Sequence, residues 1–305
     1  MSAPTGTQYT LSLGGQQAVV TEMGAGLRSY AVDGRELVTS FAESTRPQGC
    51  QGQQLMPWPN RIRDGKWSLD GADFQLPVNE PERGNAIHGL VKDRMWTLVD
   101  QAPEHVTQRL LLEPEQGWPG TLELLLTHQL SEAGLGVEVT ARNLGTAAAP
   151  FGYAAHPYLL PPDPQVALDE CVLVLPFAQR LESDERLLPV ALHDVAGTTF
   201  DRRGPLPVAG LELDTAFTSP VLADGQWQAQ LAGGDSRTVL WASPELGWVQ
   251  VYTPGDRASI AVEPMTVGPD AYNPGPTHDD LVLLQPGESF ACHWGLRREL
   301  VLPAA

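Results

Sequence analysis

The chain has 305 residues and a formal net charge of −18, with 37 aspartates and glutamates against 19 lysines and arginines. A chain this negative repels nucleic acids and anionic membrane surfaces, so we expect neither as a partner. The same charge disfavours polyanionic substrates and leaves a small uncharged molecule as the better fit. Its 27 prolines and 30 glycines interrupt the sequence too often for long helices.

The cysteines and the N-terminus indicate the compartment. Cys50, Cys171 and Cys292 are far apart, odd in number and without the paired spacing of zinc sites or disulfide frameworks. They are typical of buried thiols in a reducing compartment. Residues 1–7 lack the basic and apolar regions of a signal peptide, and no later run is long enough to span a membrane. We therefore expect a cytoplasmic protein.

Alternating apolar residues predict antiparallel strands along most of the chain. The clearest hairpin is 66–76, in which Trp67 and Leu69 face Phe74 and Leu76 across the turn. The other predicted strands and hairpins are 9–13, 17–21, 26–38 with a turn at 33–34, 121–130, 135–141, 170–175, 238–242, 248–252, 259–263 and 289–294. This spacing predicts an all-β fold of half-buried antiparallel sheets.

The number of domains follows from what the sequence lacks. The length permits two domains, but all-β sandwiches often exceed about 200 residues as one unit. No internal repeat, low-complexity tract or change of composition marks a linker. We therefore expect one domain over residues 1–305.

A histidine near the middle of the chain lies in a stiff setting. His156 precedes Pro157, which pushes its backbone toward an extended conformation, and Tyr153 and Tyr158 flank it. With an unperturbed pKa of about 6.5, a histidine donates or accepts protons near neutral pH. The alternative is a half-buried structural histidine satisfied by a backbone carbonyl.

Two earlier segments add polar groups suited to a ligand. Asn60 and Arg61 follow a rigid Pro-Trp-Pro segment, and the guanidinium of Arg61 offers a fork of donors suited to sugar oxygens as well as anions. The alternative for Arg61 is pairing with surface carboxylates. His88 precedes Gly89, which permits close approach of a ligand or of neighbouring backbone.

Carboxylates come from the C-terminal third of the chain. Alternation over 259–263 places Glu263 at a strand end before Pro264, as His156 is placed before Pro157. The two residues are a candidate acid and base. Asp214 lies in an apolar run, where the alternative is a turn aspartate bonded to its own backbone.

Taken together, these motifs resemble the aldose 1-epimerase (mutarotase) family. The matching segments, in the family's order, are Asn60-Arg61-Ile62, Asn85-Ala86-Ile87-His88-Gly89, His156-Pro157-Tyr158, Leu213-Asp214-Thr215-Ala216-Phe217, Glu263-Pro264-Met265-Thr266 and Pro269-Asp270-Ala271-Tyr272-Asn273. The resemblance implies a supersandwich of twisted antiparallel sheets with an open sugar cleft. It also implies interconversion of the α and β anomers of a free aldose.

The same resemblance implies a role for each site residue. His156 matches the general acid that protonates the ring oxygen, and Glu263 matches the general base that takes the anomeric proton. Arg61 with its neighbour Asn60, His88 and Asp214 match residues that bind sugar oxygens. Mutarotation needs no metal and no cofactor, so we expect neither, with a monosaccharide as the small-molecule partner and a monomer or homodimer as the assembly.

The sugar itself is left open by departures from the galactose mutarotase pattern. This chain differs from that pattern at Leu90, Leu159 and Leu160-Pro161. It resembles instead a bacterial branch of the family that includes mutarotases for other sugars, among them sulfoquinovose. A sulfonated sugar needs a cationic pocket, for which the candidates are Arg63, Lys92 and Arg94, each also explained as a surface charge. Trp58, Trp248 or Tyr272 is a candidate stacking face for a sugar, with core packing as the alternative.

Three other functions remain open at this point. A hexose-6-phosphate epimerase needs clustered arginine or lysine, and this chain has few of either. A non-catalytic carbohydrate-binding protein has no need of both His156 and Glu263. A metal hydrolase using His88, His156 and a carboxylate is disfavoured, because close His-x-His or His-Glu-x-x-His spacing is missing.

Overall fold

The protein is built almost entirely from antiparallel strands. The structure, a computed structural model, describes residues 3–301, and its only helical elements there are the short 3-10 turns η1 (Leu168–Glu170) and η2 (His278–Asp280). The all-β prediction is confirmed. None of the helical turns in this part of the chain has the length and apolar character needed to cross a membrane.

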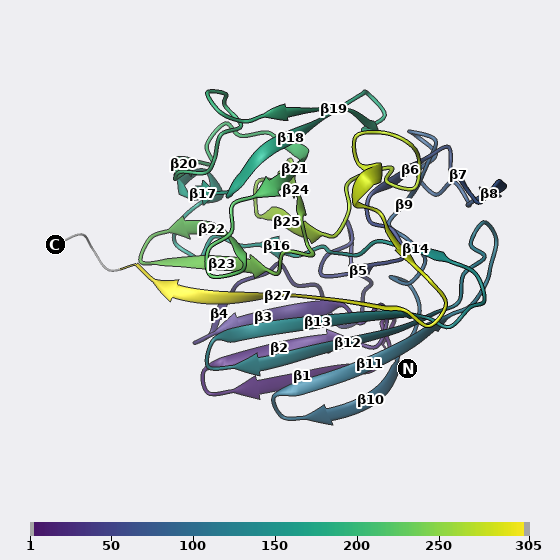
Figure 1. Ribbon diagram of the computed structural model, residues 1–305. Coiled ribbons are helices and arrows are strands. Elements are labelled where there is room, and N and C mark those ends of the chain that lie inside the picture. The colour runs from purple at the N-terminus through teal and green to yellow at the C-terminus, as the bar shows by residue number, and fades with distance from the viewer. Residues whose placement is uncertain (1–2, 302–305) are drawn as a thin grey trace.

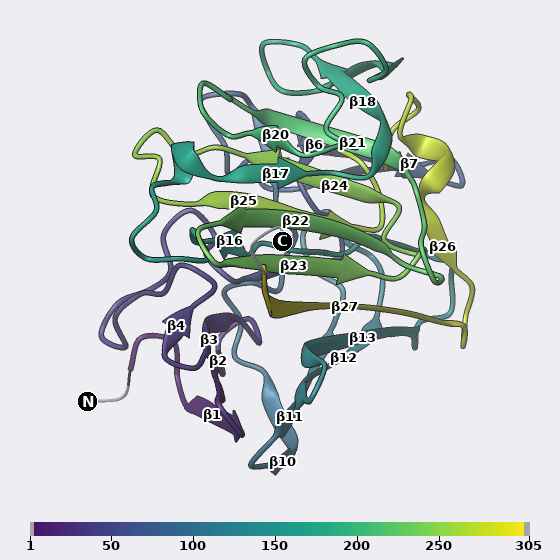
Figure 2. The ribbon, with the colours of Figure 1, turned by 90° about the vertical axis from the view of Figure 1, so that its left-hand side faces the viewer.

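The largest sheet has nine strands and forms one wall of the molecule (Figures 1 and 2). In spatial order its strands are β10 (Thr97–Ala102), β11 (His105–Leu112), β12 (Leu122–Ser131), β13 (Gly134–Asn143), β27 (Ser289–Leu300), β23 (Ser236–Ala242), β22 (Trp227–Gly233), β17 (Val172–Val174) and β20 (Leu206–Pro207). Along β12 and β13 nearly every second side chain is buried, so one face of this wall packs on the core and the other faces solvent.

The second large sheet has eight strands, seven of them on its main path, and carries most of the polar residues discussed below. In spatial order they are β19 (Pro189–Asp194), β18 (Phe177–Ser183), β21 (Asp214–Pro220), β24 (Trp248–Tyr252), β25 (Ile260–Met265), β15 (Ala154–Ala155) and β5 (Gln54–Leu55), with β16 (Tyr158–Leu159) paired to β25 off this path. β25 is buried along its whole length, because it has strand partners on both sides.

Smaller sheets complete the layers. A four-stranded sheet contains β1 (Gln8–Leu13), β2 (Gln16–Thr21), β3 (Leu27–Val32) and β4 (Arg35–Glu36), and lies beside β10–β13 at the bottom of Figure 1. The two-stranded pairs are β6 (Arg61–Arg63) with β9 (Asn85–Ile87), β7 (Lys66–Leu69) with β8 (Ala72–Gln75), and β14 (Ala149–Phe151) with β26 (Val282–Leu284).

The predicted hairpin over 66–76 is confirmed in its register. Trp67 lies opposite Phe74, and their rings stack with centroids 4.4 Å apart. Asp70 and Gly71 both have positive φ, 50° and 80°, as the tight turn between β7 and β8 requires. The other predicted strands correspond to β1 to β4, β12, β13, β17, β23, β24, β25 and β27. The sequence analysis missed β10, β11, β18, β19, β21 and β22 and the short strands β5, β6, β9, β14, β15, β16, β20 and β26. In β10 and β19 exposed residues leave little alternation to detect.

One large buried apolar cluster extends from Tyr9 in the first strand to Leu296 in the last, and joins residues of all the larger sheets. The expectation of one domain over residues 1–305 stays a prediction. Packing of this cluster fixes the eight-stranded sheet against the loops that precede β6 and follow β9, where polar side chains gather.

Candidate active site

The six residues predicted from the sequence as acid, base and sugar ligands line the same pocket. Its volume is about 310 Å³. The predicted lining residues are Asn60, Arg61, His88, His156, Asp214 and Glu263, and they are joined by Gly49, Cys50, Arg83, Tyr158, Gln250 and Tyr252. The chain therefore brings together segments that are about 200 residues apart in the sequence.

His156 is held by its backbone and left free at its ring. Its N–H donates to the carbonyl of Gln53 at 3.0 Å, and its carbonyl accepts from the N–H of Gly52 at 2.9 Å. The imidazole stacks on Tyr158 with centroids 5.0 Å apart and is 6% exposed. Its Nδ1 is buried without a hydrogen-bond partner in the described residues. The ring is thus fixed in direction while keeping proton-transfer capacity.

Glu263 lies beside this ring. Its Oε1 is 3.4 Å from His156 Nε2, and the side chain is buried. β25 continues through Pro264 to Met265, so the expectation that Glu263 ends its strand is wrong. Proline fits here because its nitrogen faces the side of the short strands β15 and β16, to which Val262 and Thr266 donate, whereas the continuous ladder with β24 is on the other side.

Burial shifts the two groups in opposite directions. It raises the pKa of Glu263 well above its ordinary value, Asp214 adds to this shift, and Arg61 opposes it. Burial also lowers the pKa of His156 to about 4. Each shift disfavours the charged form of the group, as expected for titratable groups removed from water. Between the two pKa values the pair carries a single proton.

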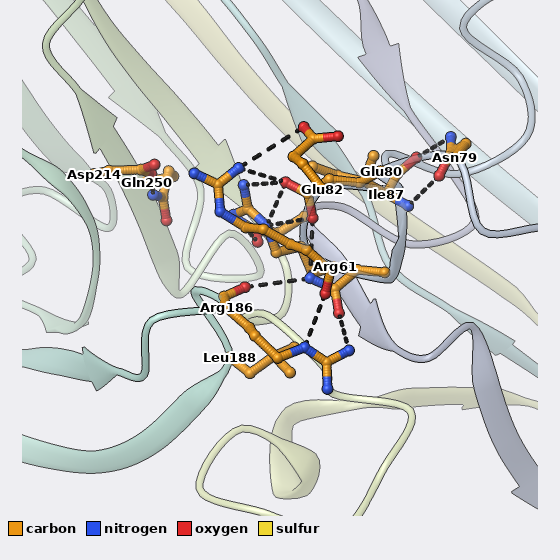
Figure 3. A network of polar contacts seen from close by, with 12 residues as sticks. Arg61, Asn79, Glu80, Glu82, Ile87, Arg186, Leu188, Asp214 and Gln250 are labelled. Carbon is orange, nitrogen blue, oxygen red and sulfur yellow. Dashed lines mark hydrogen bonds and ion pairs between the residues drawn. The ribbon is translucent and has the colours of Figure 1, made fainter.

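Arg61 enters the pocket from β6 and is anchored by a buried carboxylate (Figure 3). Its Nε donates to Glu80 Oε2 at 2.9 Å and its Nη2 donates to Glu80 Oε1 at 2.9 Å, an arrangement typical of bidentate arginine pairs. Its Nη1 donates to Asn60 Oδ1 at 3.2 Å. The surface-pairing alternative for Arg61 is therefore wrong, because arginine and partner are both buried.

His88 and Asn60 are placed by left-handed backbone. Their φ angles are 64° and 51°, and the N–H of His88 donates to the carbonyl of Asn60 at 2.9 Å. At Gly89 a Cβ would lie 2.0 Å from the carbonyl oxygen of Met56, so only glycine fits. Close approach of neighbouring backbone, rather than of a ligand, explains this glycine. The imidazole of His88 then lies edge-on to that of His156, with centroids 5.5 Å apart.

Asp214 is the first residue of β21 and not a turn residue, so the turn interpretation is wrong. It accepts a hydrogen bond from Gln250 Nε2 at 2.6 Å and is exposed to solvent. Gln250 lies opposite Glu263 on the neighbouring strand, and its Oε1 is buried without a partner in the described part of the chain. Asp214 and Gln250 thus present oxygen atoms to the pocket.

Gln250, Glu80 and Arg83 were missed in the sequence. The sequence contains a signal for Gln250, because it is a polar residue in the middle of the apolar run Trp248–Tyr252 and lies on the same face of that strand as Tyr252. Glu80 had none, since it is one of several acidic residues in a polar loop and only tertiary packing buries it. Arg83 likewise looks like a surface residue in the sequence.

The candidate stacking rings and sulfonate-binding cations do not line the pocket. Trp58, Trp248 and Tyr272 are core residues, each at most 3% exposed, and the aromatic side chains of the pocket are Tyr158 and Tyr252. Trp58, Trp248 and Tyr272 lie where sheets and loops pack against each other, and this packing buries large rings.

The cations proposed for a sulfonate all have partners elsewhere. Arg63 pairs with Asp270 at 3.4 Å, Lys92 pairs with Asp93, and Arg94 pairs with Glu115. The arginines of the pocket are Arg61 and Arg83. No group of three or more His, Cys, Asp or Glu side chains in residues 3–301 is arranged to hold a metal ion.

Comparison with known proteins gives this site a family. The family model described as Aldose 1-epimerase matches residues 7–296. The chain belongs to the aldose 1-epimerase family. An Escherichia coli K12 relative, "Uncharacterized protein YihR", is 33% identical over 288 residues, covering 93% of this chain and 91% of that protein. Human galactose mutarotase is 28% identical over 179 residues, covering 56% of this chain and 51% of that enzyme.

Solved structures of this family share the fold. A galactose mutarotase-like protein from Clostridium acetobutylicum superposes with a TM-score of 0.85 at 19% identity, covering 96% of this chain and 95% of the other. An aldose epimerase homologue from Caenorhabditis elegans gives 0.83 at 18% identity, with 97% and 99% covered. The expected mutarotase-like supersandwich is therefore confirmed, and membership of the family marks the protein as an isomerase-type enzyme.

Proposed function

We propose that the protein is a mutarotase that interconverts the α and β anomers of a free aldose by acid–base catalysis. The observation that carries this proposal is the buried His156–Glu263 pair, 3.4 Å apart and aimed into a pocket lined by polar donors and acceptors. Ring opening requires one group to give a proton to the sugar and another to take one, and a pair that holds a single proton can do both.

In the proposed cycle, protonated His156 donates to the ring oxygen while ionised Glu263 takes the proton of the anomeric hydroxyl. The bond from C1 to the ring oxygen breaks and leaves the open-chain aldehyde. Rotation about the C1–C2 bond presents the other face of the carbonyl. The ring then closes with Glu263 as the acid and His156 as the base, which restores both groups and yields the other anomer.

The shifted pKa values suit these roles. A histidine whose pKa is lowered to about 4 is a stronger acid when protonated, and a glutamate with a raised pKa is a stronger base when ionised. In the empty pocket burial favours the neutral pair, with the proton on Glu263. Binding of a sugar must therefore move this proton to His156, and the hydroxyls of the sugar are the groups that stabilise the resulting charges.

Sugar binding is assigned to the remaining polar groups. Arg61, whose Nη atoms keep hydrogens for a ligand, lines the pocket together with His88 and Asn60. Asp214 and the partnerless Oε1 of Gln250 offer acceptors for sugar hydroxyls. Buried acceptors without partners favour a ligand that brings donors, because an unpaired buried acceptor costs free energy.

The test is polarimetry or exchange NMR on freshly dissolved α-anomers of glucose, galactose and sulfoquinovose, with and without the purified protein. We expect anomer exchange to accelerate for at least one of them. If none is accelerated while titration still detects sugar binding, the protein is a carbohydrate-binding protein and the catalytic proposal fails.

A mutarotase for a sugar with an anionic substituent is a second candidate. Arg83 lines the pocket with 37% of its side chain exposed, and its Nη1 shares Glu80 Oε1 with Arg61. Two guanidinium groups that share one buried carboxylate leave a net positive charge beside the pocket. This candidate predicts that sulfoquinovose or glucose 6-phosphate exchanges faster than glucose, and that Arg83→Gln removes the difference.

A further inference from the structure

Among the carboxylates near the pocket, Glu80 accepts the most hydrogen bonds, and it contacts the guanidinium of Arg61 without lining the pocket itself. It is 5% exposed. Besides the bonds from Arg61, its Oε2 accepts a hydrogen bond from Asn85 Nδ2 at 2.9 Å and its Oε1 accepts one from Arg83 Nη1 at 3.1 Å. Glu80 does not line the pocket, so it acts on a ligand only through the arginines.

Backbone hydrogen bonds link Glu80 to the strand pair that contains Arg61. The N–H of Glu80 donates to the carbonyl of Asn85 at 3.0 Å, and the N–H of Asn85 donates back to Glu80 at 3.2 Å. Asn85 begins β9, which pairs with β6, the strand that starts at Arg61. Because Asn85 lies opposite Arg63, two residues from Arg61, the segments that carry the carboxylate and the guanidinium are joined by backbone hydrogen bonds.

Glu80 is ionised in this setting. Burial alone would raise its pKa, but hydrogen bonds from Arg61 and Asn85 and the charge of Arg61 outweigh burial and lower it. Its negative charge therefore offsets the positive charge of Arg61. Without that offset, Arg61 would stabilise the ionised form of Glu263 more strongly, since Arg61 already opposes the rise in the Glu263 pKa.

We propose that Glu80 is a positioning residue of the site: it fixes the guanidinium of Arg61 toward the sugar and limits the positive charge that Arg61 presents to Glu263. The kinetic part of this inference rests on the proposed mutarotase function, whereas the electrostatic part does not. The titratable or charged groups that act on Glu263 or Glu80 are His156, Asp214, Arg61, Tyr158, Cys50, Arg83 and, through Arg83, Glu82.

The electrostatic test measures the pKa of Glu263 by carbon NMR of its carboxyl group in the empty protein. In Glu80→Gln we expect this pKa to fall by about half a pH unit or more, because the charge of Arg61 is no longer offset. The matched control is Glu82→Gln, the same substitution two residues away on a side chain that is 64% exposed. This control is expected to shift the Glu263 pKa much less than Glu80→Gln does, because Glu82 is exposed and contacts Arg83 at 3.9 Å rather than Arg61.

A second variant, Glu80→Asp, tests the position of the Arg61 guanidinium separately from the charge of residue 80, because it keeps a carboxylate beside Arg61. Glu80→Asp keeps the charge but shortens the side chain, so the guanidinium loses its fixed place. We expect KM for the sugar to rise about tenfold, with kcat and the Glu263 pKa close to wild type. Combined with Arg61→Lys, the Glu80→Asp change is expected to add little further loss, as holds for residues acting through one another.

Two results would overturn the inference. One is a Glu263 pKa that is the same in wild type and folded Glu80→Gln, together with an unchanged KM in Glu80→Asp. The other is full additivity of Glu80→Asp and Arg61→Lys. If the wild type accelerates no sugar, the proposed function fails, and the NMR titration still decides the electrostatic part.

Discussion

Two of the hollows in residues 3–301 are of similar size but differ in the backbone that forms them. The pocket at His156 holds about 310 Å³, and a groove on the outer face of the nine-stranded sheet, around Trp241 and His293, holds about 370 Å³. The pocket gathers two carboxylates, two histidines and two arginines. The groove presents side chains of regular strands to solvent. Volume alone therefore does not identify an active site.

The groove exists because side chains are missing. Gly136 and Gly295 are neighbours on β13 and β27, and Trp241 lies next to Gly295 on β23. A Cβ on Gly295 would lie 2.5 Å from the Trp241 ring, so the indole lies across the space that glycine leaves. The pocket instead depends on irregular backbone, with left-handed φ at Cys50, Asn60 and His88. Such conformations cost free energy and concentrate at functional sites.

The sharpest test of this difference removes the acid and the base. We expect His156→Ala and Glu263→Gln each to lower kcat about 10² to 10⁴-fold, because each removes one partner of proton transfer. Anomer exchange by NMR measures kcat, and circular dichroism checks the fold. The control is His193→Ala, which removes an exposed histidine paired with Glu182. Near-native turnover in Glu263→Gln would show that the base is misassigned.

The next effect concerns binding rather than turnover. Arg61→Ala is expected to raise KM by about one to two orders of magnitude, with a smaller change in kcat, because it removes donors to the sugar without touching the proton pair. It also leaves Glu80 buried without its main partner, so thermal unfolding must accompany the kinetics. Arg63→Ala on the same strand, an exposed arginine, serves as the control. A fall in kcat alone would contradict the assignment.

A buried histidine outside both hollows extends the comparison to stability. His128 on β12 is fully buried, neither ring nitrogen has a partner in the described residues, and burial lowers its pKa to about 3. Below about pH 6.5 the unfolded chain binds a proton that the folded protein refuses until about pH 3, so the free energy of unfolding falls as the pH drops through this window.

His128→Leu is expected to remove the fall in the free energy of unfolding that His128 causes at low pH. For one group this fall amounts to about 1.4 kcal/mol per pH unit between the two pKa values. Urea unfolding at several pH values between 3 and 7 measures it. The slope due to His156, whose pKa is lowered as well, remains in this variant. Parallel stability curves for wild type and His128→Leu would mean that His128 is protonated or partnered in the folded protein.

The smallest expected effect is at the groove. Trp241→Ala removes its largest side chain, and we expect kcat and KM for the sugar to stay within about twofold of wild type, since the groove contains none of the residues of the acid–base site. The same NMR assay measures it. A large loss of turnover in a folded Trp241→Ala protein would mean that the two hollows are coupled.

Much of the framework was determined by local sequence. Alternating apolar residues predicted β12 and β13, and the hairpin of β7 and β8 formed with the register that Trp67 and Phe74 indicate. The family motifs named residues that the structure collects in one pocket, and Gly89 follows His88 because no side chain fits against Met56. The roles of these residues remain predictions.

The tertiary structure decided which polar residues are buried and what they touch. Glu80 and Glu82 look alike in one acidic loop, yet 6% of the Glu80 side chain and 64% of the Glu82 side chain is exposed. Asp214 looked like a turn residue until β21 paired with β24, and Tyr272 looked like a ligand face until it packed on Trp58 and Trp67. Periodicity along a chain encodes which face of a strand is apolar. It does not encode which distant segment covers that face. The covering segment decides how deeply each polar side chain is buried, which partners it has and how its pKa shifts.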